Sequence, residues 1–209
     1  MELVIIIGII ILQSIVFYKV YSKVSVLKKF FPSVNQLSIK NREVEFNKEI
    51  KVNVDYINLE TNTSIEFKET IDPTNSYLEN NKGSAADFNI IKDITERHIE
   101  TIVNSINSTI SAPLFLGLAG TFFGIIYGLS FLEFSDMDNG VSVITTESIS
   151  SLIVGVVTAM IASAVGLILT LINSAWLYKD ALYINEKDKN NFYDFIQSKL
   201  LPKLSKDVS

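Results

Sequence analysis

The sequence predicts an all-α membrane protein with three transmembrane helices, of which the second and third extend into the cytoplasm, and a small cytoplasmic insertion. Two observations predict this class: three runs of residues carry no Asp, Glu, Lys or Arg, and lysines flank only some ends of these runs. The charge-free runs are residues 3–18, 113–132 and 149–177. About 20 apolar residues cross a hydrocarbon core about 30 Å thick. The second and third runs meet this length, and the first meets it when it extends to residue 21.

The first transmembrane helix, residues 1–21, is predicted to be a retained anchor. A cleaved signal peptide is the alternative, and it normally has a basic start and a small-residue cleavage site. This chain has Glu2 where Lys or Arg is expected, and no such site follows the apolar run. A retained anchor therefore fits the sequence better.

The charges beside the apolar runs predict the orientation of the chain. Cytoplasmic loops carry an excess of Lys and Arg. Lysines follow the first and third runs, whereas the loop between the second and third runs holds only acidic charges. The N-terminus is therefore expected outside and the C-terminus in the cytoplasm. The residues concerned are Lys19, Lys23, Lys28, Lys29, Lys179, Lys187 and Lys189, and in the loop Glu133, Asp136, Asp138 and Glu147.

Residues 22–111 are predicted to form a cytoplasmic region that is helical from about residue 72. Between residues 43 and 67 the stretches IKVNVDY and SIEFKET alternate apolar and polar residues. Alternation with β-branched residues is typical of short strands. We therefore expect a small β-containing part near the membrane.

Two helices are predicted after these strands. Asp72 followed by Pro73 is typical of a helix start, with Asp as N-cap and Pro at the first helical position. This helix is expected to end near Gly83. A second helix, with Ser84 and Asp87 as its capping signal, keeps apolar residues at helical spacing up to the membrane.

The rest of the chain is predicted as a transmembrane hairpin with a helical tail. The second transmembrane helix covers residues 112–134 and the third covers residues 149–178. The extracytoplasmic loop between them is residues 135–148. The tail, residues 179–209, is expected to form an amphipathic helix that Pro202 ends.

Small residues line one face of each helix of this hairpin. Each glycine costs a helix about 1 kcal/mol relative to alanine, so several in one helix need a reason. In lipid, helices associate through close backbone approach, which small residues permit. We predict that the two helices pack through these faces, within one subunit or between copies. The glycines are Gly117, Gly120, Gly124 and Gly128 in the second helix, and Gly155 and Gly166 in the third.

Three hydroxyls, those of Thr121, Thr158 and Ser163, lie in the middle of the two spans. A single helical hydroxyl can bond the carbonyl one turn back, so it has no necessary function. The spans hold no carboxylate, lysine or histidine, although ionisable residues are the usual carriers of ion paths. If the protein conducts ions, the titrating group must come from another chain. The three hydroxyls are then the candidate pore residues.

Composition excludes several functional classes. The chain has no cysteine and a single histidine, His98, so disulfides and thiolate metal sites are absent and one histidine cannot build a metal site alone. A net charge of −5 argues against nucleic acid as a partner. No HExxH or GxSxG motif is present. We expect no enzymatic activity, no cofactor and no metal.

Two motifs resemble those of a known family. PLFLGLAGTFFGI, residues 113–125, resembles the second-span signature of the MotA/TolQ/ExbB proton channel family, an LGLxGT-type run after a proline. TAMIASAVGL, residues 158–167, is similar to the third-span signature of that family. The order of anchor, insertion, hairpin and tail also matches. The motifs cover about residues 111–174.

The resemblance implies a homo-oligomeric ring, typically of five subunits, in a bacterial inner membrane. Such rings surround two copies of a single-span partner whose intramembrane Asp faces hydroxyls of the ring. By position, Thr121 matches the second-span threonine and Ser163 the third-span threonine. Thr158 stands where ExbB-type members carry a glutamate. This departure leaves the ring without a carboxylate of its own and leaves sodium open as the carried ion.

Three functions remain in competition at this point. The first is a channel motor that couples ion flow to movement of a TolR/ExbD/MotB-like partner. The second is a membrane scaffold or anchor without conduction, in which the small-residue faces serve only assembly. Residues 77–97 have a weaker similarity to the Zorya subunit ZorA, which implies a motor of a phage-defence system. The short tail argues against a long-tailed ZorA.

Overall fold

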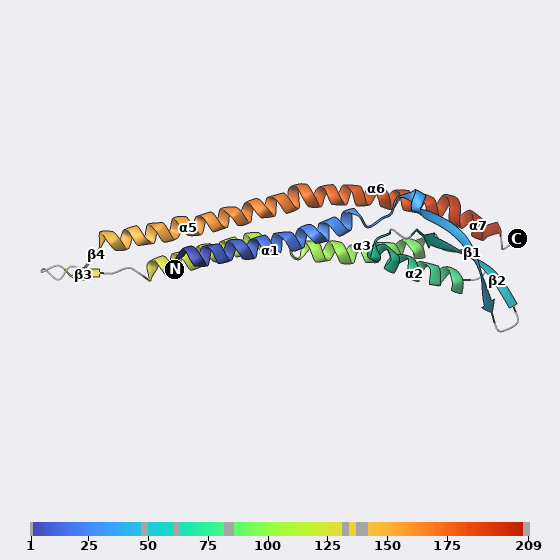
Figure 1. The fold of residues 1–209 in the computed structure, drawn as a ribbon, viewed down its shortest axis with the longest axis horizontal. Helices are drawn as coiled ribbons and strands as arrows, with labels where there is room; N and C mark the ends of the chain where they lie inside the picture. The colour runs from blue at the N-terminus through green and yellow to red at the C-terminus, as the bar shows by residue number, and fades with distance from the viewer. Residues whose placement is uncertain are drawn as a thin grey trace. The chain divides into compact units, whose positions relative to one another are not determined.

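The computed structural model describes residues 2–46, 50–60, 63–81, 86–130, 134–136 and 142–206, and most of them are helical (Figure 1). The chain divides into two compact units. Unit 1 consists of Met1–Lys23 and Ile106–Lys179, and unit 2 consists of Val24–Ser105 and Asp180–Ser209.

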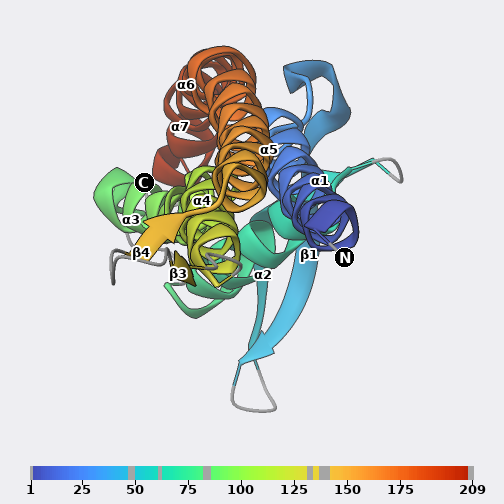
Figure 2. The same cartoon turned by 90° about the vertical axis from the view of Figure 1, so that its left-hand side faces the viewer.

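Unit 1 is built from three helices that lie side by side, α1 (Glu2–Lys28), α4 (Ala112–Leu129) and α5 (Thr146–Leu171) (Figure 2). α4 and α5 are antiparallel, because the start of α4 at Pro113 meets Gly166 late in α5. The described part of α4 ends at Leu129, before the predicted boundary at residue 134.

A short hairpin of two strands lies between α4 and α5. Strands β3 (Phe134–Asp136) and β4 (Ser142–Ile144) pair antiparallel. Thr145 then caps α5, since its hydroxyl accepts the backbone N–H of Ser148 at 3.3 Å. α5 therefore starts at Thr146, three residues before the predicted start of the third span, and two unpredicted strands lie in the region predicted as a loop.

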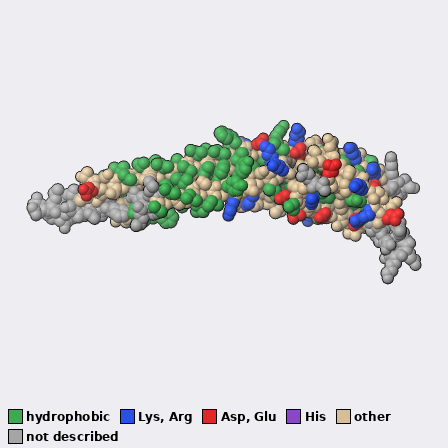
Figure 3. Space-filling model, in the orientation of Figure 1, with side chains coloured by type: hydrophobic (Ala, Val, Ile, Leu, Met, Phe, Trp, Pro, Cys, Tyr) green, Lys and Arg blue, Asp and Glu red, His purple; other side chains and the backbone are tan. Residues whose placement is uncertain are grey.

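The outer surface of unit 1 is apolar. Hydrophobic side chains cover much of the face of these helices that Figure 3 shows. Within the described residues, three helices are long and apolar enough to cross a membrane, Ile6–Lys28, Phe88–Leu129 and Thr146–Leu204. The chain is thus compatible with a multi-pass membrane protein, as predicted. The exposed apolar side chains include Phe115, Phe122, Phe123 and Ile126 of α4, and Ile153, Val157, Met160 and Ile161 of α5.

Unit 2 contains the predicted strands, at a different position. After a short 3-10 turn, η1 (Val34–Gln36), β1 (Leu37–Phe46) pairs antiparallel with β2 (Ile50–Leu59). The two-stranded sheet therefore lies at residues 37–46 and 50–59 instead of residues 43–67, and the residues of SIEFKET after Ser64 are helical. Phe67 of this stretch and Ile71, the residue after it, are four residues apart, and both side chains are buried on one helix face.

Helix α2 (Ile65–Asn80) begins earlier than the predicted start near residue 72, which was wrong. Ser64 is the N-cap, because its hydroxyl accepts the backbone N–H of Phe67 at 3.2 Å. Pro73 lies inside the helix, on its exposed side. Water can therefore hydrate the carbonyl group that loses its N–H donor at Pro73, so the proline does not end the helix.

Helix α3 (Phe88–Asn107) begins after Asp87, whose carboxylate accepts the backbone N–H of Asn89 at 2.8 Å. A turn follows α3, and α4 then starts with Pro113 in its first turn, as predicted. The predicted helix end at Gly83 and the capping residue Ser84 lie outside the described residues.

The core of unit 2 is aromatic. The rings of Phe30, Phe31, Phe67 and Phe192 stack mainly edge to face, with centroids 4.9 to 5.8 Å apart. Each of these side chains is at most 7% exposed. The Asn75 amide then ties α2 to β2, because it donates to the Ile57 carbonyl and accepts the Ile57 N–H, both at 2.9 Å.

The C-terminal part of the chain stays helical over its whole described length. A π-helical segment, η2 (Ile172–Tyr178), leads to α6 (Lys179–Phe195), a second one, η3 (Ile196–Leu200), and α7 (Leu201–Lys206). The prediction that Pro202 ends this helix was wrong. Pro202 is the second residue of α7 and directly follows the π-helical turns, where the i→i−4 pattern that a proline would break is already absent.

Candidate functional site

The candidate site lies in unit 1, where glycines bring helices into backbone contact. A Cβ placed on Gly117 would lie 2.9 Å from the Ser163 Cα, and one on Gly124 would lie 2.4 Å from the Ala159 Cβ. These distances are shorter than van der Waals contact, so glycine is required. Gly120, Gly128, Gly155 and Gly166 are also within contact distance of a neighbouring helix: of Ile9, Leu152, Gly124 and Pro113, respectively.

A buried glutamine links the three helices of unit 1 through hydrogen bonds. Gln13 of α1 is fully buried, and its Nε2 donates to the backbone carbonyl of Pro113 in α4 at 3.2 Å and of Ala162 in α5 at 3.0 Å. A Cβ on Gly166 would lie 2.7 Å from this Nε2. The glycines therefore make room for the amide as well as for the backbones.

The Thr121 hydroxyl lies at the contact between α4 and α5. Its oxygen is 3.1 Å from the Gly117 carbonyl oxygen of its own helix and 3.5 Å from the Ala159 carbonyl oxygen of α5. The hydroxyl proton therefore has acceptors within the subunit. This geometry gives Thr121 a packing role in the hairpin whether or not it also lines a pore.

Thr158 and Ser163 do not lie together. They are five residues apart on α5, which places them about 140° apart around a helix of 3.6 residues per turn. The buried contact face, with Ala159 and Ala162, runs between them. The Thr158 hydroxyl donates to the Val154 carbonyl, and both side chains are half-buried. One subunit therefore offers a hydroxyl on each flank of the hairpin.

The contact face of α5 ends in polar residues. Thr170 is 8% exposed, and its hydroxyl oxygen accepts the backbone N–H of Leu114 at 3.1 Å. Asn173, the second residue of η2, is fully buried, and neither its Oδ1 nor its Nδ2 has a hydrogen-bond partner among the described residues.

Sequence reasoning missed Gln13 and Asn173. The search for an ion path was limited to side chains that ionise and to hydroxyls, whereas the amide side chains of Gln and Asn do not ionise. A usable signal was present, since each of these residues is a lone amide inside a charge-free run. Burial of polar groups in a helix bundle requires hydrogen-bond partners, so such amides mark interhelical contacts.

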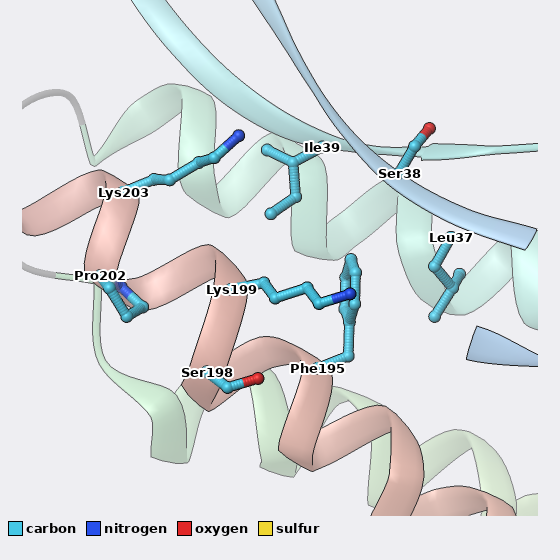
Figure 4. Close-up of a pocket in the computed structure, with 8 residues that line it drawn as sticks. All are labelled: Leu37, Ser38, Ile39, Phe195, Ser198, Lys199, Pro202 and Lys203. Carbon is cyan, nitrogen blue, oxygen red and sulfur yellow. The ribbon is translucent and has the colours of Figure 1, made fainter. Parts of the chain in front are cut away.

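Unit 2 has an open groove of about 460 Å³ between β1 and the C-terminal helix. Figure 4 shows Leu37, Ser38 and Ile39 on one side, and Phe195, Ser198, Lys199, Pro202 and Lys203 on the other. The Lys199 ammonium lies 5.8 Å from the centroid of the Phe195 ring. The groove residues include no carboxylate and no histidine, so they offer no acid–base pair.

In the part of the chain that the structure describes, no group of three or more His, Asp or Glu side chains could hold a metal ion. Comparison of the chain with protein-family models, curated proteins and solved structures finds no match.

Proposed function

We propose that this chain is the ring-forming subunit of an ion channel motor in a bacterial inner membrane. In this proposal about five copies surround a single-span partner that supplies an intramembrane Asp, and proton flow past that Asp moves the partner. The chain itself has no enzymatic role and needs no cofactor. The N-terminus lies outside and the C-terminus in the cytoplasm.

The arrangement of hydroxyls around α5 is the observation that carries the proposal. α4 occupies the small-residue face of α5, yet Thr158 and Ser163 remain half-buried on its two flanks. Lipid tails offer a hydroxyl no hydrogen-bond partner. A hydroxyl that faces a neighbouring subunit or a lumen can instead bind a carboxylate or an ion. A ring of hairpins would place both flanks at such surfaces.

A scaffold without conduction is the second candidate. The observation that favours it is the Thr121 hydroxyl, whose proton has acceptors in its own subunit. A motor of a phage-defence system shares the channel mechanism and differs in its partner.

Proton flux separates the channel from the scaffold. The chain would be purified with the single-span protein of its gene neighbourhood that carries an intramembrane Asp, and flux would be measured in proteoliposomes with a pH-sensitive dye. Ser163→Ala is expected to reduce flux by tenfold or more while ring mass, measured by native mass spectrometry, stays that of about five subunits. Ser151→Ala, an exposed serine of the same helix, is the matched control. Normal flux in the Ser163 variant would reject Ser163 as a pore residue, and absence of flux in the unmodified complex favours the scaffold.

Cysteine labelling tests the orientation. Asn139→Cys is expected to react with an impermeant maleimide in intact cells, because the acidic loop lies outside. Lys187→Cys is expected to react only after the membrane is opened. The reverse pattern would overturn the proposed orientation.

A further inference from the structure

The two outer edges of the sheet in unit 2 differ in what covers them. Among the described strands, β1 and β2 pair only with each other, so each has one outer edge. On β2 this edge is occupied, because the Asn75 side chain of α2 bonds to both the N–H and the C=O of Ile57 at 2.9 Å. An uncovered strand edge presents its backbone groups to solvent or to another chain. The edge of β2 is therefore closed at Ile57.

The matching edge of β1 is open at Ile39. Ile39 lies directly opposite Ile57 in the antiparallel register. Two opposite residues of such a pair direct their backbone groups either toward each other or away from each other. Because the groups of Ile57 are directed to Asn75, the N–H and C=O of Ile39 point away from β2. No described residue supplies a hydrogen bond to either of these two groups of Ile39.

This open edge borders the groove between β1 and the C-terminal helix (Figure 4). Leu37, Ser38 and Ile39 form one side of the groove. The Leu37 and Phe195 side chains, each at most 7% exposed, contribute apolar surface to it. A strand that adds to a sheet edge bonds through its backbone, while alternate side chains point to the two faces of the sheet. The groove therefore offers an added strand both backbone partners and an apolar surface.

The charge of the groove indicates which strand fits it. Lys199 and Lys203 line the groove, both are exposed, and its lining residues include no carboxylate. Neither lysine forms an ion pair with a described residue. A segment that carries carboxylates would therefore meet opposite charge. A second copy of β1 lacks such an excess, since its two basic and two acidic residues balance. These are Lys40, Arg42, Glu43 and Glu45.

We propose that the groove of unit 2 binds an extended acidic segment of another protein, which adds to β1 as a third strand. The backbone of this segment bonds to the N–H and C=O of Ile39, and its carboxylates approach Lys199 and Lys203. The backbone bonds supply affinity for an extended chain, and the two lysines select a segment of negative charge. This binding is independent of ion conduction by unit 1.

Peptide binding to the full chain in a neutral detergent tests the site. The probe is a fluorescent peptide of alternating Glu and Val, and fluorescence anisotropy measures its affinity. It is expected to bind at least tenfold more tightly than a peptide of alternating Lys and Val. It is also expected to bind at least tenfold more tightly than the same Glu and Val peptide N-methylated at every residue, which keeps the charge but has no backbone N–H donors. Equal affinity for the Lys peptide would overturn the acidic occupant, and equal affinity for the N-methylated peptide would overturn strand addition.

Paired charge changes test the place of binding. Lys199→Glu with Lys203→Glu is expected to weaken binding of the Glu and Val peptide at least tenfold. Lys179→Glu with Lys187→Glu, two exposed lysines of α6 outside the groove, makes the same change in net charge and should leave binding nearly unchanged.

Two results would reject the groove as the site of an acidic strand. An equal loss in the two double variants would show attraction to the net charge of the chain. Absence of binding by every peptide would leave the two lysines only the role of keeping other chains from the edge of β1. A peptide with the sequence of residues 37–46 tests a second copy as the occupant. Tighter binding of this peptide than of the Glu and Val peptide would make the groove an interface between copies and overturn the acidic partner.

Discussion

The two units of this protein follow opposite rules for what is inside and what is outside. Unit 1 has glycine, alanine and amides at its helix contacts and large apolar side chains such as Phe122 on its surface. Unit 2 has four phenylalanine rings in its core and charged groups on its surface, where Lys28 and Asp180 form an ion pair at 2.6 Å.

The difference follows from the solvent that each unit suits. In water, burial of large apolar side chains drives folding, so the aromatic residues of unit 2 are inside. In lipid that drive between helices is absent, and close backbone contact and polar groups hold helices together. Loss of a large side chain should therefore damage unit 2, whereas gain of one should damage unit 1.

The largest effect is expected from removal of an aromatic side chain in unit 2. Phe67→Ala leaves a cavity among three other rings and is expected to cost about 3–5 kcal/mol of unfolding free energy. Thermal unfolding in detergent, followed by circular dichroism, measures this loss. Ile65→Ala, on the same helix but 71% exposed, is the control and should change little. Equal melting temperatures for the two variants would contradict the claim that buried aromatic side chains stabilise unit 2.

The opposite change tests unit 1. Gly166→Leu would force a Cβ to within 2.4 Å of the Pro113 carbonyl oxygen and 2.7 Å of the Gln13 amide nitrogen. Overpacking commonly costs about 1–3 kcal/mol, so the yield of folded protein from membranes should fall. Gly8→Leu is the matched control, since no atom apart from adjacent residues and the backbone of its own helix lies within 4 Å of the Cβ position at Gly8. Equal yields would show that unit 1 tolerates added bulk at its contacts.

A smaller loss of stability is expected when the Thr121 hydroxyl at the α4–α5 contact is removed. Thr121→Val keeps the shape of the side chain and removes the bond to the Gly117 and Ala159 carbonyl oxygens. Hydrogen bonds between membrane helices average about 0.6 kcal/mol, so assembly should fall only slightly. Size-exclusion chromatography measures assembly of the proposed ring, and proton flux in the same samples shows whether Thr121 also lines the proposed pore. Loss of flux with normal assembly would add a pore role to its packing role.

The smallest change in stability at neutral pH is expected when the hydroxyl of Tyr193 is removed. Tyr193 lies in α6, beyond the apolar part of the helix. Its hydroxyl is buried without a hydrogen-bond partner among the described residues. Burial raises the pKa of this hydroxyl above its ordinary value of 10.0, and Glu96, Glu186 and Asp93 raise it further. The unfolded chain therefore loses this proton first, and stability falls as the pH rises above about 10.

Tyr193→Phe removes this dependence. At pH 7 the variant should unfold at nearly the same temperature as the unmodified protein, because the hydroxyl makes no hydrogen bond to a described residue. Above pH 10 the variant should lose less stability than the unmodified protein. Identical losses from pH 9 to 11 would show that the hydroxyl ionises as easily in the folded state as in the unfolded one.

The sequence by itself predicted those features that local composition decides. Three charge-free runs predicted three apolar helices, since the length of such a run is a local property. The spacing of glycines such as Gly117 and Gly124 predicted which face of α4 would be in contact. Pro113 marked the start of that helix, because a proline fits the first turn whatever the tertiary structure is.

Only the tertiary structure decided where helices begin when two signals compete. Local pattern predicted a helix start at Asp72 with Pro73, whereas Ser64 begins a stretch whose pattern predicted a strand. The structure uses Ser64, whose hydroxyl also donates to the Phe30 carbonyl at 3.0 Å, and Asn75 fixes the helix to β2. A contact with a residue 34 positions away cannot be read from local pattern.

The amides of the candidate site show the same limit. Gln13 and Asn173 lie in apolar runs whose one-dimensional pattern does not show which side chains face the helix contacts. Gln13 is bonded to residues 100 and 149 positions away, and this pairing exists only once α1, α4 and α5 are together. The sequence determined that these residues are polar and uncharged. Folding determined that they are buried, because burial depends on which helices surround them.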